Sequence, residues 1–200
     1  MKANVNKNNF HKQLKVILLG ETGVGKTNII SRYVADLFIE KSLTTVGSTH
    51  IEKNLQKNNI IYKLHIWDTS GQERYHSITK LYIQNSDIIL LVYSIDNIQS
   101  FASLDYWYKE INNLCGNNFI LGIAGNKYDL FDDDSIEKVT DEEGEKYAKE
   151  KNAIFKLISA KKDKKGIDSL FNILLDEYLL LELYSIIFGK GKNNDHELFF

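Results

Sequence analysis

The chain has 200 residues, the size of one globular domain with a complete hydrophobic core. Its formal net charge of −2 at pH 7 excludes an overall attraction to nucleic acid or to anionic lipid. A single cysteine, Cys115, excludes a disulfide framework and favours a reducing, cytoplasmic compartment. The polar start of the chain is unlike a secretory signal, and residues 1–13 are expected to form a flexible arm.

From residue 14 onward, short apolar runs alternate with longer segments of helical spacing, which is typical of strands connected by crossover helices. The expected strands are 14–19, 50–57, 60–67, 88–93, 119–124 and 154–158, with a hairpin turn at 57–59. The expected helices are 27–36, 99–114 and 140–151, the last one starting with a capping box. The sequence therefore predicts an α/β fold, with a six-stranded, mostly parallel sheet covered by helices on both faces.

A phosphate-binding pattern follows the first expected strand. Gly20-Glu21-Thr22-Gly23-Val24-Gly25-Lys26-Thr27 matches G-x-x-x-x-G-K-[ST] and stands between a strand and a helix, as that pattern requires. Glycines let backbone N–H groups turn toward phosphate oxygens, and the helix adds its positive N-terminal end. We expect Lys26 to reach the β- and γ-phosphates and Thr27 to ligate Mg²⁺. A chance glycine-rich turn is the alternative, and the loop alone leaves ATP and GTP both open.

Two short segments after later strands are candidates for recognising the base of the nucleotide. Asn126-Lys127-Tyr128-Asp129 resembles the N-K-x-D element of the Ras-like GTPases, and Ser159-Ala160-Lys161 resembles their S-A-K element. A carboxylate at Asp129 is able to accept two hydrogen bonds from guanine's ring N–H and amino group, which adenine does not offer. Together with the phosphate loop, these segments argue against an ATP-using phosphoryl transferase. The nucleotide that co-purifies with the protein would distinguish such an enzyme from a guanine-nucleotide-binding protein.

Two further segments resemble the switch regions of the Rab family. Residues 67–75, Trp-Asp-Thr-Ser-Gly-Gln-Glu-Arg-Tyr, are similar to the Rab switch II pattern W-D-T-A-G-Q-E-R-[YF], with Ser70 in place of alanine. Residues 44–50, Thr-Thr-Val-Gly-Ser-Thr-His, are similar to the Rab switch I pattern T-I-G-x-x-F, with His50 in place of phenylalanine. The resemblance covers residues 14–175 and implies a P-loop NTPase G domain over residues 14–177 that binds GTP or GDP with Mg²⁺.

The resemblance also implies roles for individual residues. Asp68 would hold the magnesium ion, Gly71 would sense the γ-phosphate and Gln72 would orient the attacking water. Thr45 is assigned to Mg²⁺ in the GTP state by its register with Gly47, although the adjacent Thr44 is chemically alike. The metal ligands implied are Thr27, Thr45 and Asp68. The nucleotide-binding residues implied are Glu21, Thr22, Gly23, Val24, Gly25, Lys26, Thr27, Asn28, Phe38, Thr45, Gly71, Asn126, Lys127, Asp129, Ser159, Ala160 and Lys161, with a core role as the alternative for Phe38.

Partners are implied by the same resemblance. His50, Trp67 and Tyr82 match the aromatic triad that Rab effectors read, and His50 is expected to alter that surface. A GTPase-activating protein, an exchange factor and effectors are the expected partners, with a role in vesicle trafficking and a resemblance to the endosomal Rab branch. The alternative function is a nucleotide-locked binding module with negligible hydrolysis, which a single-turnover measurement would separate from a working switch.

The end of the chain departs from the Rab pattern. Residues 195–200 contain no cysteine for prenylation, and Lys2 follows Met1, so neither prenylation nor myristoylation is expected and membrane association would be indirect. The segment 173–188 is too short and too charged to span a bilayer. Residues 178–200 are expected to be an apolar helical extension and a tail, in which 178–188 continues the last helix and mediates association. Packing back onto the domain is the alternative.

Overall fold

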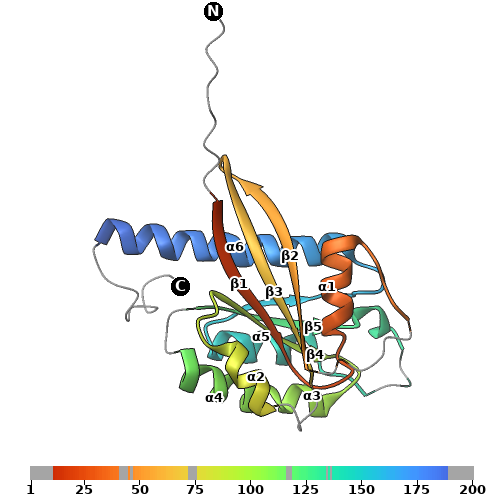
Figure 1. Cartoon of the computed structure of the whole chain (residues 1–200). Helices are drawn as coiled ribbons and strands as arrows, with labels where there is room; N and C mark the ends of the chain where they lie inside the picture. The colour runs from red at the N-terminus through yellow and green to blue at the C-terminus, as the bar shows by residue number, and fades with distance from the viewer. Residues whose placement is uncertain are drawn as a thin grey trace, which may run out of the picture.

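The fold is a single six-stranded sheet in the order β2-β3-β1-β4-β5-β6 (Figure 1). The computed structural model describes residues 11–40, 45, 47–71, 76–115, 119–133, 135 and 137–188, and of residues 11 and 76–79 it describes the backbone alone. The strands are β1 (His11–Leu19), β2 (Ser48–Lys57), β3 (Ile60–Thr69), β4 (Ile88–Ser94), β5 (Ile120–Asn126) and β6 (Ile154–Leu157). The β2–β3 pair is antiparallel and the other pairs are parallel, as the sequence predicts.

The helices cover both faces of the sheet. They are α1 (Lys26–Ala35), α2 (His76–Ile83), α3 (Ile98–Ala102), α4 (Leu104–Cys115), α5 (Asp141–Glu150) and α6 (Lys164–Phe188), with a 3₁₀ turn, η2 (Tyr128–Leu130). Helices α1 and α6 pack on one face and α2 to α5 on the other, so the sheet separates two hydrophobic clusters. Every residue of β4 and β5 is buried, because both strands lie between these layers. The predicted α/β architecture is confirmed.

Local chemistry explains how several elements begin and turn. Thr140 and Glu143 form the predicted capping box at the start of α5. Asn58 and Asn59, with φ of 50° and 62°, make the tight turn between β2 and β3, and asparagine is among the residues that tolerate this conformation. The segment expected as one helix over 99–114 is instead two, α3 and α4. They divide at Ser103, whose hydroxyl donates to the Ser100 carbonyl at 2.9 Å and competes with the regular helical hydrogen bonds.

Both predicted domain limits fall inside regular elements. Strand β1 begins at His11, so the expected boundary between residues 13 and 14 lies within it. Helix α6 runs without interruption through residue 177 to Phe188. Residues 1–10 and 189–200 lie outside the described residues. Among the residues that are described, no helix combines the length and the apolar character needed to cross a membrane.

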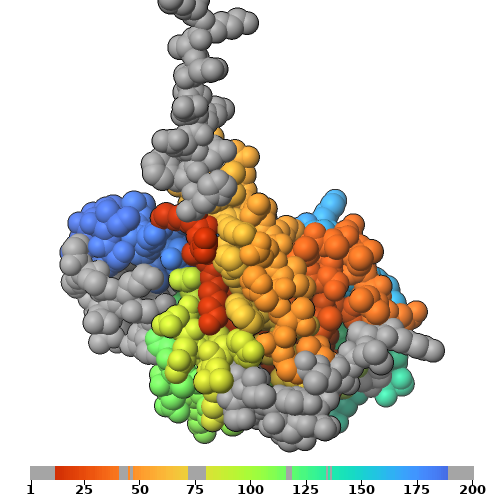
Figure 2. Space-filling view, viewed as in Figure 1, coloured from red at the N-terminus to blue at the C-terminus, as the bar shows by residue number. Residues whose placement is uncertain are grey.

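The distal segment of α6 (residues 178–188) has one covered side and one open side. Tyr178 is buried, while Leu179 and Leu181 pack against the core cluster that α6 shares with α1. Lys12 on β1 forms an ion pair with Glu182 at 2.6 Å, which holds the helix against the sheet. The exposed side carries Leu180, Leu183, Ile186, Ile187 and Phe188, all more than half exposed. Figure 2 shows the end of α6, in blue, at the surface on one side of the molecule.

Candidate functional site

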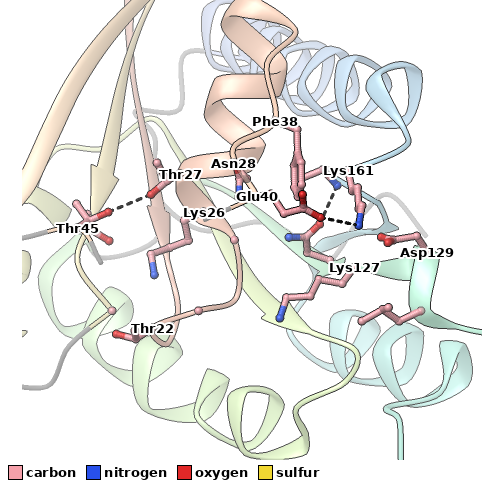
Figure 3. A pocket seen from close by; sticks show the side chains of 17 residues that line it. Thr22, Lys26, Thr27, Asn28, Phe38, Glu40, Thr45, Lys127, Asp129 and Lys161 are labelled. Carbon is pink, nitrogen blue, oxygen red and sulfur yellow. Dashed lines mark hydrogen bonds and ion pairs between the residues drawn. The ribbon is translucent and has the colours of Figure 1, made fainter. Parts of the chain in front are cut away.

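The carboxyl ends of the parallel strands meet at a cleft of about 390 Å³, a volume typical of small-molecule sites (Figure 3). Loops after β1, β3, β5 and β6 line it, together with α1, Phe38, Glu40 and Thr45. The lining residues are Thr22, Gly23, Gly25, Lys26, Thr27, Asn28, Phe38, Glu40, Thr45, Thr69, Gly71, Asn126, Lys127, Asp129, Leu130, Ala160 and Lys161. Residues predicted from five separate stretches of sequence therefore share one cavity.

Lys26 lies at the base of this cleft. Its ammonium group donates to the carbonyls of Gly20 at 2.7 Å and Glu21 at 2.9 Å, and its side chain is almost fully buried. Burial lowers the pKa of Lys26 to about 8, against the opposing effect of the carboxylates of Asp68 and Glu21. A desolvated lysine at the start of α1 is a strong partner for a phosphate group.

Two glycines allow the loops around Lys26 to approach closely. Gly25 has φ of 94°, and a Cβ there would lie 2.4 Å from the side-chain nitrogen of Asn126. A Cβ on Gly71 would lie 2.2 Å from the backbone carbon of Glu21. Any side chain at either position would push these loops apart, so the cradle depends on glycine at both places.

Three oxygen-bearing side chains meet beside Lys26. The Thr27 hydroxyl donates to Asp68 Oδ2 at 2.7 Å and lies 3.0 Å from the Thr45 hydroxyl, which lies 3.5 Å from the same carboxylate oxygen. Asp68 Oδ1 is buried and has no hydrogen-bond partner among the described residues. Burial raises the pKa of Asp68, while the hydrogen bond from Thr27 and the charge of Lys26 lower it. Hydroxyl and carboxylate oxygens with one unsatisfied buried oxygen fit a Mg²⁺ ion.

The other side of the cleft is held together by Asn126. Its amide donates to the Val24 carbonyl at 2.8 Å, and its oxygen accepts from the Ala160 N–H at 3.1 Å. This one side chain therefore joins the phosphate loop, the end of β5 and the loop after β6. Asp129 accepts a hydrogen bond of 2.5 Å from the Ser159 hydroxyl, which fixes the carboxylate at the cleft. Lys127, with φ of 65°, pairs with Asp96 at 3.4 Å.

Other predicted residues occupy mixed positions. Phe38 lines the cleft and also packs against the core, so both roles considered for it are present in the geometry. The Asn28 side chain exchanges two hydrogen bonds with the backbone of Ile39 and supports the loop that carries Phe38. Val24 and Ser159 are buried behind the cleft wall. Gln72 lies outside the described residues, so its predicted role stays a prediction.

Sequence reasoning missed several residues at this site. Glu40, Thr69 and Leu130 line the cleft, and Glu40 forms an ion pair of 3.4 Å with Lys161 (Figure 3). Asp96, which holds Lys127, follows β4 and was not singled out as part of the site. The available signal for Asp96 was its place after a buried strand, at the edge where open α/β sheets bind ligands.

The predicted aromatic surface lies beside the cleft. The ring centroid of Trp67 is 5.0 Å from that of His50 and 4.8 Å from that of Tyr82, so the three rings are continuous. Lys15 lies over the Trp67 ring at 5.8 Å. The neighbouring Ser70 is fully buried, and its N–H donates to the Gly47 carbonyl at 2.8 Å, which joins the two switch segments.

A strand, a glycine-rich loop and a helix surround a buried lysine, and loops after β5 and β6 line the same cleft. This arrangement defines a P-loop nucleotide-binding protein. The family model described as Ras family matches residues 15–179. Human Ras-related protein Rab-22A is 39% identical over 150 residues, covering 75% of this chain and 76% of that protein. Human Rab-31 is 40% identical over 150 residues (75% of each), and RABF2a of Arabidopsis thaliana is 38% identical over 147 residues (74% and 72%).

The chain belongs to the Rab family of small GTPases, within the Ras family. It is therefore a guanine-nucleotide-binding protein that hydrolyses GTP to GDP and phosphate. The family resemblance predicted from the phosphate loop, the base-reading segments and the switch segments is confirmed.

Proposed function

We propose that this protein is a Rab switch in vesicle and membrane trafficking that holds GTP with Mg²⁺ in the described cleft and hydrolyses it slowly. The observation that carries the proposal is the meeting of three groups in one cavity. These groups are the buried Lys26, the oxygen cluster of Thr27, Thr45 and Asp68, and the carboxylate of Asp129. Each suits a different part of the ligand: phosphate, metal ion and base.

On the phosphate side, Lys26 contributes a desolvated positive charge. Triphosphate oxygens would take the place of the Gly20 and Glu21 carbonyls as its acceptors, and charge-assisted hydrogen bonds of this kind are about twice as strong as neutral ones. Thr27, Thr45 and Asp68 would hold Mg²⁺, which supplies charge neutralisation at the β- and γ-phosphates. Gly71 lines the cleft, and we expect its backbone N–H to meet the γ-phosphate and to respond to its loss.

On the base side, Asp129 selects guanine. Its carboxylate is held by Ser159, so it does not need to be ordered when the base arrives. Adenine would leave this acceptor unpaired, and sites built around such hydrogen bonds reject the wrong ligand by about 10⁴- to 10⁵-fold. Lys127 is held by Asp96 where its stem is able to lie along the base.

The proposal of slow hydrolysis rests on the side chains that are available near the phosphate side of the cleft. Gln72 is proposed to orient the attacking water. Arg32 is the arginine within the described residues, and it donates to the carbonyls of Ala160 and Lys161 on the base side of the cleft rather than to the phosphate side. Because no arginine of the described residues lies at the phosphate side, we expect intrinsic turnover on the order of 10⁻⁴ per second, which a GTPase-activating protein would raise about 10³- to 10⁵-fold.

Single-turnover hydrolysis of GTP preloaded on the purified protein tests this proposal. A slow, complete conversion to GDP that accelerates with a GTPase-activating protein is the expected result. GTP that stays intact over many hours would instead show a nucleotide-locked binding module. A protein that retains ATP in preference to GTP would overturn the base assignment.

The partners proposed are an exchange factor, a GTPase-activating protein and effectors that read His50, Trp67 and Tyr82. The similarity to Rab-22A and Rab-31 supports the proposal that the protein acts at endosomal or other vesicle membranes. The exposed side of the distal segment of α6 supports a further proposal, that this segment associates with a second copy or a protein partner.

A further inference from the structure

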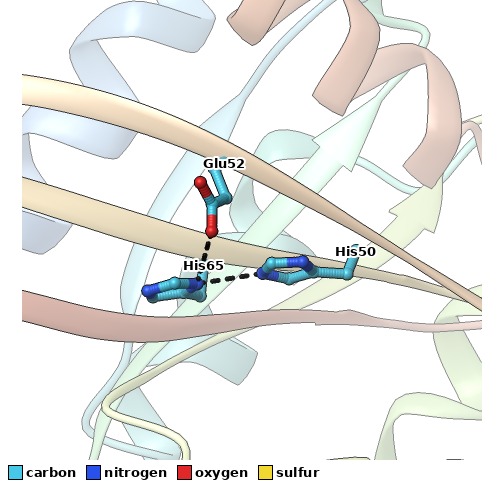
Figure 4. A group of neighbouring side chains, drawn as sticks. All are labelled: His50, Glu52 and His65. Carbon is cyan, nitrogen blue, oxygen red and sulfur yellow. Dashed lines mark hydrogen bonds and ion pairs between the residues drawn. The ribbon is translucent and has the colours of Figure 1, made fainter.

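A cluster of two histidines and one glutamate lies on the β2–β3 hairpin, outside the nucleotide cleft. His50 and Glu52 are two residues apart on β2 and so project from the same face of the sheet. In the antiparallel pairing Glu52 lies opposite His65 on β3, and His50 lies diagonally from it. Figure 4 shows the three side chains pointing toward one another.

We propose that His50, Glu52 and His65 form a binding site for a zinc-type divalent metal ion. His50 Nε2 lies 3.0 Å from His65 Nδ1, and His65 Nδ1 lies 3.5 Å from Glu52 Oε1. All three ligand atoms lie within 4.8 Å of one another. Ligands about 2.0–2.1 Å from a tetrahedral zinc ion are about 3.3 Å apart, so the separations of 3.0 and 3.5 Å at His65 Nδ1 lie on either side of the value that zinc requires.

The chemistry of the cluster also favours such an ion. The cluster brings together three atoms that are able to act as metal ligands. A proton between the two histidine rings satisfies their nitrogens but leaves Glu52 Oε1 without a share in that hydrogen bond. Imidazole nitrogens select zinc and its neighbours over Mg²⁺ or Ca²⁺, and two imidazoles with one carboxylate form a known three-ligand set with an open fourth position. His65 Nε2 is buried and has no hydrogen-bond partner among the described residues, so its Nδ1 side makes the polar contacts of this ring.

The surroundings already contain part of a supporting shell. Glu52 uses its second oxygen, Oε2, for an ion pair of 2.7 Å with Lys63, which leaves Oε1 directed at His65. Carboxylates that bind metals are commonly held by such a second partner. His50 and Glu52 are exposed, and His65 is only partly covered, so an ion and a water molecule have access from solvent.

The position of this site links it to the recognition surface. The His50 ring stacks on His65 with an interplanar angle of 11° and contacts Trp67 at 5.0 Å. An ion held by both histidines would fix the orientation of His50 and add positive charge beside Trp67. Its open coordination position would be available to a side chain of a bound partner.

Zinc titration of the GDP-bound full chain tests the site, with excess Mg²⁺ present so that the oxygen ligands of the nucleotide cleft are saturated. The background is a variant without the other histidines and the cysteine, H11Q/H76Q/C115S/H196Q, which retains the proposed ligands. It should bind one zinc ion per chain with the affinity of the parent protein. Adding H50F, E52Q or H65Q should weaken binding at least about tenfold, since even supporting residues contribute about 10- to 100-fold.

Two controls separate the site from general effects. Glu110→Gln removes a carboxylate that is paired with Lys80 at 2.7 Å, as Glu52 is paired with Lys63, and it should leave zinc affinity unchanged. Retention of GDP will show that each variant is folded. His50→Phe introduces the residue that the Rab pattern has at this position. Zinc binding that survives both H50F and H65Q, or that is lost in the background variant, would place the ion elsewhere and overturn the proposal.

Discussion

The nucleotide cleft and the distal segment of α6 break the usual distribution of residues in opposite ways. In the cleft, Lys26, Asp68 and Asn126 are polar yet no more than 5% exposed. On the distal segment, Leu180, Ile186 and Phe188 are apolar yet about 60% exposed or more. Buried polar groups need partners of defined geometry, so a cleft lined by them selects a particular ligand. Exposed apolar groups favour contact with any apolar surface and do not select a particular partner.

The largest expected effect follows from removing a ligand-specifying group in the cleft. Lys26→Ala or Asp129→Ala should weaken GTP and GDP binding by about 10²- to 10⁴-fold, because hydrogen bonds to charged groups contribute about 1.5–3 kcal/mol each and more than one is lost. Nucleotide affinity is the measurement, with Lys149→Ala and Asp132→Ala as matched controls at exposed positions. Unchanged affinity in K26A or D129A would remove that residue from the site.

Two truncations of α6 separate the contribution of the packed side of the distal segment from that of its exposed side. A chain ending at Asp176 loses Tyr178, Leu179, Leu181 and the Lys12–Glu182 ion pair, and it should be about 2–5 kcal/mol less stable to denaturant. A chain ending at Glu182 keeps these contacts and should retain most of the stability. Both truncations remove the exposed side chains of Leu183, Ile186, Ile187 and Phe188, and light scattering should show less self-association in each. If the intact chain is a monomer at high concentration, self-association is excluded.

Hydrolysis should depend on Gln72 much more than binding does. Gln72→Leu removes a group needed only to position water on the way to the transition state, so GTP affinity should stay nearly constant while single-turnover hydrolysis slows at least about tenfold. Parental hydrolysis in this variant would show that another group positions the water.

The smallest effect concerns pH and the burial of Lys26. Burial lowers the pKa of Lys26 to about 8 in the nucleotide-free protein, and bound phosphate would raise it again. Nucleotide binding should therefore take up a proton above about pH 8, so GDP affinity is constant below that pH and falls above it by up to about tenfold per pH unit. Calorimetry in two buffers of different ionisation enthalpy measures the proton uptake. No uptake at about pH 9 would contradict a buried, shifted lysine.

The contrast between the cleft and the distal segment of α6 also explains which features could be predicted from the sequence. The strands and the hairpin were predictable from apolar runs and turn residues. Most of the cleft was predictable because a phosphate, a metal ion and guanine each demand particular residue types at particular spacings, as proposed for Lys26 and Asp129. The break at Ser103 was not, because it depends on one hydroxyl competing for a backbone carbonyl.

Long-range pairs were equally hidden from the sequence. Lys127 meets Asp96 and Lys161 meets Glu40 only because the fold brings distant segments to one edge of the sheet. The packed side of the distal segment also could not be predicted, since its apolar residues surround the helix axis and give no direction. The His50, Glu52 and His65 cluster needed the register of β2 and β3 to be known.

Competition between guanine and adenine nucleotides tests the central claim most directly. Labelled GDP bound to the intact protein with Mg²⁺ is challenged with unlabelled GDP or ADP over a wide concentration range. The account predicts displacement by GDP near stoichiometric concentration and none by ADP at about a thousandfold excess, because adenine leaves Asp129 unpaired. Equal displacement by ADP would contradict the account, since the cleft would then bind phosphates without reading the base.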